Sequence, residues 1–270
     1  MSKKDKIIYL KSEEELEIIL QNGLILGKAH AEVAKIIEPG VTTKALDKVA
    51  HDYIKDNGGE PSFLGLYGFP ASLCISLNDV VVHGIPSNRV LKDGDIVSVD
   101  GGVFKNGYHA DSAYTYTVGE VRNEVLELLK HTYQSLFKGI EQARTSNRVG
   151  DISFAVQSYA EKFRYGVVRE LVGHGVGRHL HESPEVPNFG KRGNGPKLQE
   201  GMVIAIEPMI TLGRRAVVQE NDGWTIRTED RKQAAHYEHT VVVRKERAEI
   251  LTTFHYIEEV LVNKNVFIAK

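Results

Sequence analysis

The sequence predicts an α+β fold in which helices precede strands in each half of the chain. Helical periodicity covers residues 12–57 and strand periodicity follows over residues 60–118, and the same order returns over residues 121–164 and 202–243. Blocks of helices followed by blocks of strands are typical of α+β proteins, whereas a doubly wound sheet alternates single strands with single helices. We therefore expect two helix-then-strand halves and no wound βαβ sheet.

The first two predicted helices have recognisable ends. Ser12 followed three residues later by Glu15 is a capping box, in which each residue satisfies a free N–H of the other. Apolar residues then recur at helical spacing as far as Ile37, and Pro39 ends the pattern. A second helix is predicted to begin near Thr43 and to end before the pair of glycines that follows it.

Two more helices are predicted over about residues 121–144 and 151–164. Strand patterns, in which apolar residues alternate or form short runs, lie between and after the helices. The predicted strands cover residues 71–82, 96–99, 202–206, 216–219, 224–227 and 236–243. No segment has the composition of a long linker, so we expect one catalytic domain over residues 1–270.

The strand that ends at Asp100 is predicted to fold back on itself. Asn106-Gly107 is a strong signal for a two-residue hairpin loop, and with this loop Asp100 pairs with Ala113. Asp111 then lies on the same face as Asp100, as its diagonal neighbour. Two carboxylates so close repel each other unless a cation lies between them. The two glycines after Asp100 could instead introduce a bulge, which would shift this register.

Composition excludes several classes of protein. The 270 residues are 41% hydrophobic and 26% charged with a net charge of -2, so nothing indicates a nucleic-acid or membrane partner. No apolar run approaches the ~18 residues of a membrane span, and the apolar stretch after the basic first residues is too short for a signal peptide. The single Cys74 cannot form an internal disulfide, which fits a reducing cytosol. We expect a soluble cytoplasmic protein.

Five potential metal ligands lie inside or at the ends of short predicted strands. They are Asp100, Asp111, His174, Glu207 and Glu238. The four carboxylates carry four negative charges, which two divalent ions would neutralise. A ligand set of carboxylates and imidazole without cysteine is typical of paired metal sites that activate water. The set therefore indicates a hydrolase.

Each of these residues also has an ordinary explanation when it is taken alone. Either aspartate could be exposed or cap a turn, and His174, between two glycines, could be a solvated turn residue. Glu238 could lie on the outward face of an edge strand. His83 ends an apolar strand and could equally be a satisfied core imidazole. Glu207 ends an apolar run before a proline, where a casually solvated carboxylate is not expected.

At these residues the chain resembles the type I methionine aminopeptidases, which have the pita-bread fold. The resemblance covers roughly residues 10–253 and leaves the tail, residues 254–270, unmatched. It implies a pseudo-twofold fold with a central antiparallel sheet flanked by helices. The absence of a Cys/His extension and of a long insertion before the last third is typical of the short bacterial form. The matching segments are Val97-Ser98-Val99-Asp100, His109-Ala110-Asp111-Ser112, the run from Gly173 to Arg178, Ile206-Glu207-Pro208-Met209, Tyr237-Glu238-His239-Thr240, His83-Gly84-Ile85-Pro86 and His181-Glu182-Ser183-Pro184.

The resemblance also implies the roles of the metal ligands. Asp100 would bind one ion through both oxygens, Asp111 and Glu238 would bridge two ions, and His174 and Glu207 would bind the other. The two ions would share a water and lower its pKa. Cobalt, manganese, iron and zinc all accept these ligands, so the identity of the metal stays open.

Further residues receive catalytic roles from the same resemblance. Glu207 would move the proton of the water, and His181 would donate a hydrogen bond to the substrate carbonyl or to the oxyanion. His83 would contact the nitrogen of the scissile amide. The free amino terminus of the substrate would bind at or near a metal, which limits cleavage to the first residue.

An apolar pocket for the thioether side chain of methionine is implied as well. Its lining residues would be Leu66, Phe69, Cys74, Leu180 and Trp224. Cys74 has apolar neighbours and no adjacent base, so packing explains it better than nucleophilic catalysis. The sequence departs from the family pattern at Leu180, where phenylalanine is expected, and at Ala113-Tyr114, outside the ligand set.

Two alternatives remain from the sequence. One is a proline-specific aminopeptidase or prolidase of the same fold, which usually carries a substantial N-terminal domain, and the other is a metal-free binding module. The resemblance implies that the enzyme removes methionine from the N-termini of nascent polypeptides when the second residue is small. It places the protein as a monomer in the cytoplasm, with the ribosome exit region as a plausible neighbour.

Overall fold

The centre of the molecule is an antiparallel sheet. The computed structural model describes residues 7–270, and nine strands in this part of the chain form one sheet in which each pair is antiparallel. In spatial order its main path is β1 (Glu60–Pro61), β4 (Ile96–Lys105), β5 (Tyr108–Thr117), β14 (Glu238–Val242), β9 (Val203–Ile206), β7 (Gly173–Gly175) and β8 (Glu182–Val186). In addition, β2 (Leu73–Leu77) pairs with β4 and β15 (Glu249–Ile250) pairs with β14.

The hairpin of β4 and β5 has the predicted register. Asp100 pairs with Ala113, and the loop is Asn106-Gly107. Both loop residues have positive φ, 52° and 84°, as a type I′ turn requires. The pairing runs without a shift along the whole hairpin, so the bulge that the two glycines after Asp100 left open does not form.

Two smaller sheets complete the strands of residues 7–270. One contains β13 (Ala234–His236), β10 (Met209–Thr211) and β6 (Gly166–Val167), and the other contains β11 (Val217–Gln219), β12 (Ile226–Thr228) and β3 (Val80–Val82).

Two strands that the sequence predicts as single are each divided. The predicted strand over residues 71–82 is β2 and β3, because a turn at Asn78, with φ of 54°, reverses the chain between them. The predicted strand over residues 236–243 is likewise divided at Tyr237, between β13 and β14. The polar pair Asn78-Asp79 marks the first interruption, whereas no glycine or proline marks the second.

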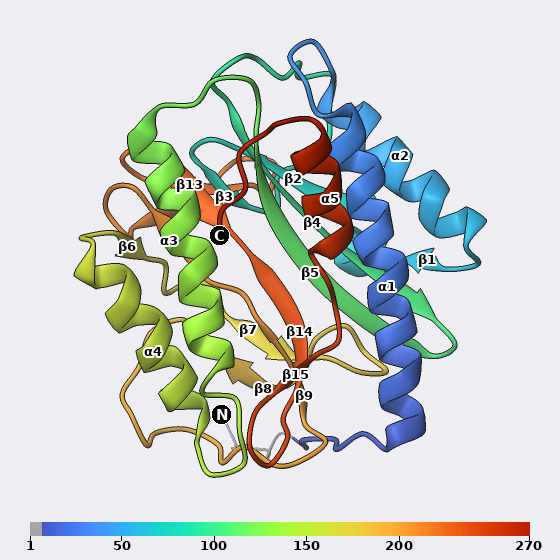
Figure 1. Cartoon of the computed structure of the whole chain (residues 1–270), viewed down its shortest axis with the longest axis vertical. Helices are drawn as coiled ribbons and strands as arrows, with labels where there is room; N and C mark the ends of the chain where they lie inside the picture. The colour runs from blue at the N-terminus through green and yellow to red at the C-terminus, as the bar shows by residue number, and fades with distance from the viewer. Residues whose placement is uncertain (1–6) are drawn as a thin grey trace.

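Helices lie over both halves of the central sheet. Figure 1 shows α1 (Glu13–Ile36) and α2 (Thr43–Asp56) over one half, and α3 (Asn123–Ile140) and α4 (Val149–Lys162) over the other. The arrangement agrees with the helix-then-strand halves of the sequence. The main hydrophobic core joins buried residues of these four helices with residues of the sheet. No helix among the described residues is long and apolar enough to cross a membrane.

Local signals explain where α1 begins. The Ser12 hydroxyl accepts a hydrogen bond from the Glu15 N–H, and the Glu15 carboxylate accepts one from the Ser12 N–H, as the predicted capping box requires. The tail, over which no element is predicted from the sequence, contains a fifth helix, α5 (His255–Asn263). It packs against α1, and its Ile257 and Leu261 are buried.

Candidate metal centre

Five neighbouring segments of the central sheet each supply one of the predicted metal ligands. Asp100 lies on β4, Asp111 on β5 and His174 on β7, while Glu238 begins β14 and Glu207 directly follows β9. These strands are consecutive in the sheet, in the order β4, β5, β14, β9, β7. The sheet therefore gathers side chains that are spread over residues 100–238 of the sequence.

The register of three strands aligns two of the carboxylates. Asp100 of β4 and Glu238 of β14 both lie opposite Ala113 of β5. Residues opposite one another in a sheet share a face, and Asp111, two residues from Ala113, shares it too. The small Ala113 side chain thus lies between the two carboxylates.

Ligand atoms of three of these residues converge. One atom each from Asp111, His174 and Glu238 lies within 4.8 Å of the other two. His174 Nε2 lies 3.7 Å from Asp111 Oδ2 and 3.6 Å from Glu207 Oε1. Distances of this size leave room for a cation between the atoms and are too long for hydrogen bonds.

Glycines around His174 allow its strand to fit between two neighbours. A Cβ atom at Gly173 would lie 2.4 Å from the Ala205 carbonyl oxygen, and one at Gly175 would lie 2.4 Å from the Ser183 carbonyl oxygen. His174 is therefore part of a tightly packed strand and not a solvated turn residue. Its Nδ1 lies 2.9 Å from the Gly175 carbonyl oxygen, which accepts the hydrogen bond, so Nε2 keeps its lone pair.

Electrostatics favour a cation among the carboxylates. Burial, followed by the charges of neighbouring carboxylates, raises the pKa of Asp100, Glu207 and Glu238 well above their ordinary values. Burial raises the pKa of Asp111 to about 7. Burial, with a contribution from His181, lowers the pKa of His174 to about 3, which keeps its imidazole neutral. Ionisation of the four buried carboxyl groups is therefore unfavourable without a cation, and a positive ion among them would offset this free-energy cost.

Unpartnered oxygens support the same conclusion. Among residues 7–270, Asp100 Oδ1, Asp111 Oδ1 and Glu238 Oε1 are buried and have no hydrogen-bond partner. Buried polar atoms are nearly always paired, so three unpartnered acceptors in one cluster indicate that the cluster is suited to hold a cation. Carboxylate oxygens with one imidazole nitrogen are a donor set that fits divalent ions of the first transition row. The residues present therefore fit a metal centre.

Burial of the carboxylates excludes the ordinary explanations, which are an exposed or turn-capping aspartate and a glutamate on the outward face of an edge strand. Asp111 is 3% exposed and Glu238 is 2% exposed, so neither lies on a solvent-facing surface. Asp100 is in the middle of β4 and caps no turn. Glu207 is partly exposed, and the cavity described next is where it reaches solvent.

A cavity of about 570 Å³ opens onto the cluster. All five predicted ligands line its wall, and His83 and His181 line it as well. The His181 ring stacks near Tyr67, with centroids 5.9 Å apart, and meets the His174 ring edge-on at 4.4 Å. Burial lowers the pKa of His83 and of His181, so both rings are neutral donors near neutrality.

Four of the five residues predicted to line a methionine pocket line an apolar part of this cavity. Leu66, Phe69, Cys74 and Trp224 line the cavity, and Phe69 meets the Trp224 ring edge-on with centroids 5.1 Å apart. Leu180 does not line it but is buried behind these residues in the same apolar cluster. Burial, and then the Asp100 carboxylate, raises the pKa of the Cys74 thiol well above its ordinary value, which opposes a role as nucleophile.

The sequence patterns do not identify two aromatic residues that line the cavity or a histidine that lies behind it. Phe63 and Tyr67 line the apolar end, and nothing in their spacing distinguishes them from surface or core aromatics. His236 lies behind Glu207, with its Nε2 3.7 Å from Glu207 Oε2, and is 1% exposed. Its alternation with Glu238 along the chain is the available signal, because residues two apart in an extended segment share a face.

Comparison with known proteins agrees with this centre. The model of metallopeptidase family M24 matches residues 17–245. The chain is 51% identical to the methionine aminopeptidase of Clostridium perfringens over 246 residues, which are 91% of this chain and 99% of that protein. It is 48% identical to methionine aminopeptidase 1 of Bacillus subtilis, again over 91% of this chain and 99% of that protein.

Solved structures confirm the predicted pita-bread fold. The methionine aminopeptidase of Thermotoga maritima matches with a TM-score of 0.90 and 41% identity, over 92% of this chain and 100% of that one. The prolidase of Pyrococcus furiosus matches with a TM-score of 0.75 and 24% identity, over 90% of this chain but 65% of that one, and this likeness concerns the fold alone. The extent of the family match and the identity to these relatives establish that the chain belongs to metallopeptidase family M24, a family of metal-dependent hydrolases.

Proposed function

We propose that the protein removes the N-terminal methionine of polypeptides whose second residue is small. The observation that carries this proposal is the buried cluster of four carboxylates and one imidazole beside an apolar cavity of about 570 Å³. The relatives named methionine aminopeptidases, at identities up to 51% over nearly their full lengths, support the same activity.

The proposed ligands of the metal are Asp100, Asp111, His174, Glu207 and Glu238. Two divalent ions would balance the four carboxylates, and cobalt, manganese, iron and zinc are all compatible with the donor set. Bound at this cluster, the ions supply Lewis-acid activation of water and of the peptide carbonyl. His174 contributes Nε2, because its Nδ1–H is held by the Gly175 carbonyl oxygen.

The proposed catalytic residues act on the substrate from the walls of the cavity. Glu207 takes the proton of the attacking water at its carboxylate and passes it to the departing amine. His181 donates a hydrogen bond to the carbonyl oxygen, on which negative charge develops. His83 contacts the nitrogen of the scissile amide. Both imidazoles are neutral near pH 7 and can therefore donate one N–H each without adding charge.

Specificity for methionine would arise at the apolar end of the cavity. Phe69, Cys74 and Trp224 offer aromatic and sulfur surfaces, which suit a flexible thioether side chain. Leu66 closes the same wall. Leu180, where the family pattern has phenylalanine, supports the wall from behind and leaves it more adaptable in shape. A branched or charged first residue would lose this contact or bury an unpaired charge.

The proposed substrates are the N-termini of nascent polypeptides in the cytoplasm, and the proposed working form is a monomer. On this view the ribosome exit region is a neighbour of the enzyme. The lack of a membrane-spanning helix within residues 7–270 is compatible with that setting.

A peptide assay tests the activity. The protein is stripped with a chelator, Mn²⁺ or Co²⁺ is added back, and free methionine is measured from Met-Ala-Ser, with Met-Phe-Ser and Ala-Pro-Ala as controls. We expect metal-dependent cleavage of the first peptide alone. Cleavage of the proline peptide instead would assign the chain to the prolidases. Cleavage of none, together with no bound metal, would favour a binding protein.

A further inference from the structure

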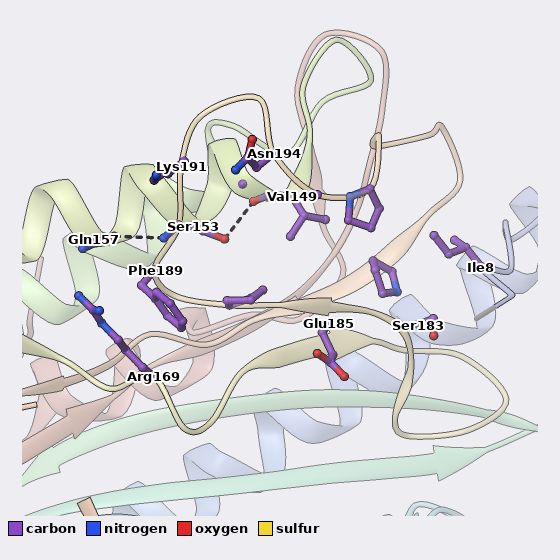
Figure 2. A pocket seen from close by; sticks show the side chains of 16 residues that line it. Ile8, Val149, Ser153, Gln157, Arg169, Ser183, Glu185, Phe189, Lys191 and Asn194 are labelled. Atoms are coloured by element: carbon purple, nitrogen blue, oxygen red, sulfur yellow. Dashed lines mark hydrogen bonds between the residues drawn. The ribbon is translucent and has the colours of Figure 1, made fainter. Parts of the chain in front are cut away.

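Strands β5 and β14 carry two of the proposed metal ligands and lie in the interior of the central sheet. Asp111 is on β5 and Glu238 on β14, and β9 and β7 separate β14 from β8, the last strand of the main path. Beyond β8 lies another cavity of about 880 Å³, between this strand and α4, and Figure 2 shows the Glu185 side chain of β8 pointing away from it. The positions of Asp111 and Glu238 are therefore set by contacts within the sheet and not at this edge.

The direct pairing of β5 with β14 is short. Two adjacent residue pairs join the strands, Glu238 with Ala113 and His239 with Ser112. Two residues beyond Glu238, the same register places Thr240 opposite Asp111. Two residues before it, the register places His236 opposite Thr115. At both positions a threonine hydroxyl makes the two hydrogen bonds that main-chain groups make in a regular antiparallel pair.

Thr240 holds the main chain of Asp111 through one oxygen atom. The Asp111 N–H donates to Thr240 Oγ1 at 3.0 Å, and Thr240 Oγ1 donates to the Asp111 carbonyl oxygen at 2.8 Å. The main-chain groups of Thr240 bond elsewhere, because its N–H donates to Thr252 Oγ1 and its carbonyl oxygen accepts from the Leu251 N–H. The side chain of Thr240 thus takes the place that its main chain would have in a regular pair.

Thr115 holds the main chain of His236 in the same way. The His236 N–H donates to Thr115 Oγ1 at 3.0 Å, and this hydroxyl donates to the His236 carbonyl oxygen at 2.7 Å. The Ser98 hydroxyl lies 2.8 Å from Thr115 Oγ1 and donates to it, because the single hydrogen of Thr115 is already used. We call the two arrangements, Thr240 with Asp111 and Thr115 with His236, the threonine clamps.

A clamp of this form restricts the backbone torsions of the residue that it holds. The N–H and C=O of one residue meet the same oxygen atom only within a narrow range of φ and ψ. Threonine is β-branched, so its hydroxyl occupies few rotamers. Thr240 is 0% exposed and Thr115 is 1% exposed, so solvent does not compete for these bonds. The direction of the Cα–Cβ bond of Asp111, and with it the reach of the carboxylate, is therefore fixed by Thr240.

We propose that the threonine clamps position Asp111 and Glu238 for metal binding. This inference rests on the proposed metal-dependent activity. Thr240 fixes Asp111 directly, and Thr115 fixes the residue two positions before Glu238, so the clamps hold the main chain on both sides of the short ladder. Precision is needed here, because ligand atoms of the two carboxylates and of His174 lie within 4.8 Å of one another. Thr240 and Thr115 are thus positioning residues, each acting through the main chain of another residue.

Valine variants test the clamps. Thr240→Val keeps the shape of the side chain and removes the hydroxyl, so the N–H and C=O of Asp111 lose their partner. Titration calorimetry of the chelator-stripped protein with Mn²⁺ should show an affinity about 10–100-fold lower, the range typical for loss of a group that orients a metal ligand. Thr115→Val should lower the affinity by a smaller factor, because His236 is not itself a proposed ligand.

Serine variants and a remote threonine separate positioning from packing. Thr240→Ser and Thr115→Ser keep the hydroxyl and should retain most of the affinity. Thr228→Val is the matched control, because Thr228 is 0% exposed and its hydroxyl donates to the Lys232 carbonyl oxygen at 2.7 Å. This control should lose stability to urea as the clamp variants do, yet bind Mn²⁺ as the unaltered protein does.

The visible absorption of bound Co²⁺ gives a second readout, because it depends on the arrangement of the ligands around the ion. We expect the spectrum to change in Thr240→Val and to stay the same in Thr240→Ser and in Thr228→Val. Loss of packing alone would lower the unfolding free energy without changing this spectrum.

The outcomes separate this inference from the proposed function. Unchanged Mn²⁺ affinity in Thr240→Val would overturn the inference and leave the proposed metal centre intact. An equal loss in Thr240→Ser or in Thr228→Val would also overturn it, because that pattern indicates packing and not the hydroxyl. If Thr240→Val does not fold, Thr115→Val decides by the same criteria. Absence of Mn²⁺ binding by the unaltered protein would overturn the proposed metal centre and the inference together.

Discussion

His236 Nε2 lies 3.7 Å from Glu207 Oε2, and neither nitrogen of this buried ring has a hydrogen-bond partner among residues 7–270. The other oxygen of Glu207, Oε1, lies 3.6 Å from His174 Nε2. The Glu207 carboxylate is thus placed between two imidazoles. A small movement would let the His236 N–H donate to Glu207 and fix the orientation of a metal-binding carboxylate.

Replacement of His236 by alanine should weaken metal binding. Loss of the partner that orients a metal ligand typically costs about 10–100-fold in metal affinity. His236→Gln keeps an N–H donor and should retain most of the affinity. Titration calorimetry with Mn²⁺ measures both variants. His239→Gln is the matched control, because His239 is equally buried but bonds to Thr252 instead. A similar loss in the control would show that packing, and not orientation of Glu207, causes the effect.

Lys11 and Glu182 form a buried ion pair next to a proposed catalytic residue. Lys11 Nζ lies 2.5 Å from Glu182 Oε2, and each side chain is 4% exposed. Glu182 follows His181 directly, so the pair ties the catalytic segment to the residues that precede α1. Lys11→Met leaves a buried carboxylate unpaired and should cost about 3–5 kcal/mol of unfolding free energy. The Lys11→Met/Glu182→Gln double variant should cost less than the sum of the single changes.

Urea unfolding of the four proteins of this cycle measures the coupling. Lys48 and Asp52 form the control pair, at the same 2.5 Å but with side chains 72% and 50% exposed. Lys48→Met should change the unfolding free energy by less than about 1 kcal/mol, because water screens an exposed pair. Additive losses in the Lys11 and Glu182 variants would contradict a direct interaction.

Much of the fold follows from local signals in the sequence. Asn106-Gly107 is enough to predict the register of the hairpin, and this register places Asp100 diagonal to Asp111. The break at Asn78 has a weaker signal, because asparagine and aspartate favour turns and tolerate positive φ, but the apolar residues on both sides of Asn78-Asp79 favour one continuous strand. Long-range packing of α5 on α1 has no local signal at all.

The metal-binding residues of the candidate site are predictable from their types, but the residues that contact them are not. Carboxylates at the ends of apolar strands are conspicuous, because such residues are rarely buried without a partner. His236 is not, since an isolated histidine in a strand has many structural roles and its contact with Glu207 depends on the pairing of β13 with β10. The cavity beside β8 depends on the approach of α4 to the edge strand, which no sequence period encodes.

Protonation of His30 should destabilise the fold in acid. Burial lowers the pKa of His30 to about 4, against about 6.5 in the unfolded chain. The folded protein therefore binds fewer protons between these values. The neutral His30 side chain contributes up to about 3 kcal/mol to the free energy of unfolding. This contribution is complete above pH 6.5 and is lost as the pH falls to about 4. His30→Gln cannot titrate, so its difference from the unaltered protein should shrink from pH 7 to pH 4.5. His255→Gln, exposed at 67%, is the control for urea unfolding at both pH values.

Removal of the metal should reveal the free-energy cost of burying the ionised Asp111 carboxylate. Burial raises its pKa to about 7 in the folded state, against about 3.9 in the unfolded chain. The stability contribution of this group is complete below pH 3.9 and is lost as the pH rises to about 7. In chelator at pH 8, the ionised Asp111 therefore destabilises the fold by up to about 4 kcal/mol.

Asp111→Asn keeps the shape of the side chain and removes the charge. In chelator at pH 8 this variant should be more stable to urea than the unaltered protein, and the difference should decrease at pH 5, where the carboxyl of the folded protein is protonated. Addition of Mn²⁺ should reverse the order, because only the unaltered protein keeps the full set of ligands and gains stability from binding. A variant that is less stable than the unaltered protein in chelator at pH 8 would contradict this account, since it would mean that the Asp111 charge is compensated within the apo protein.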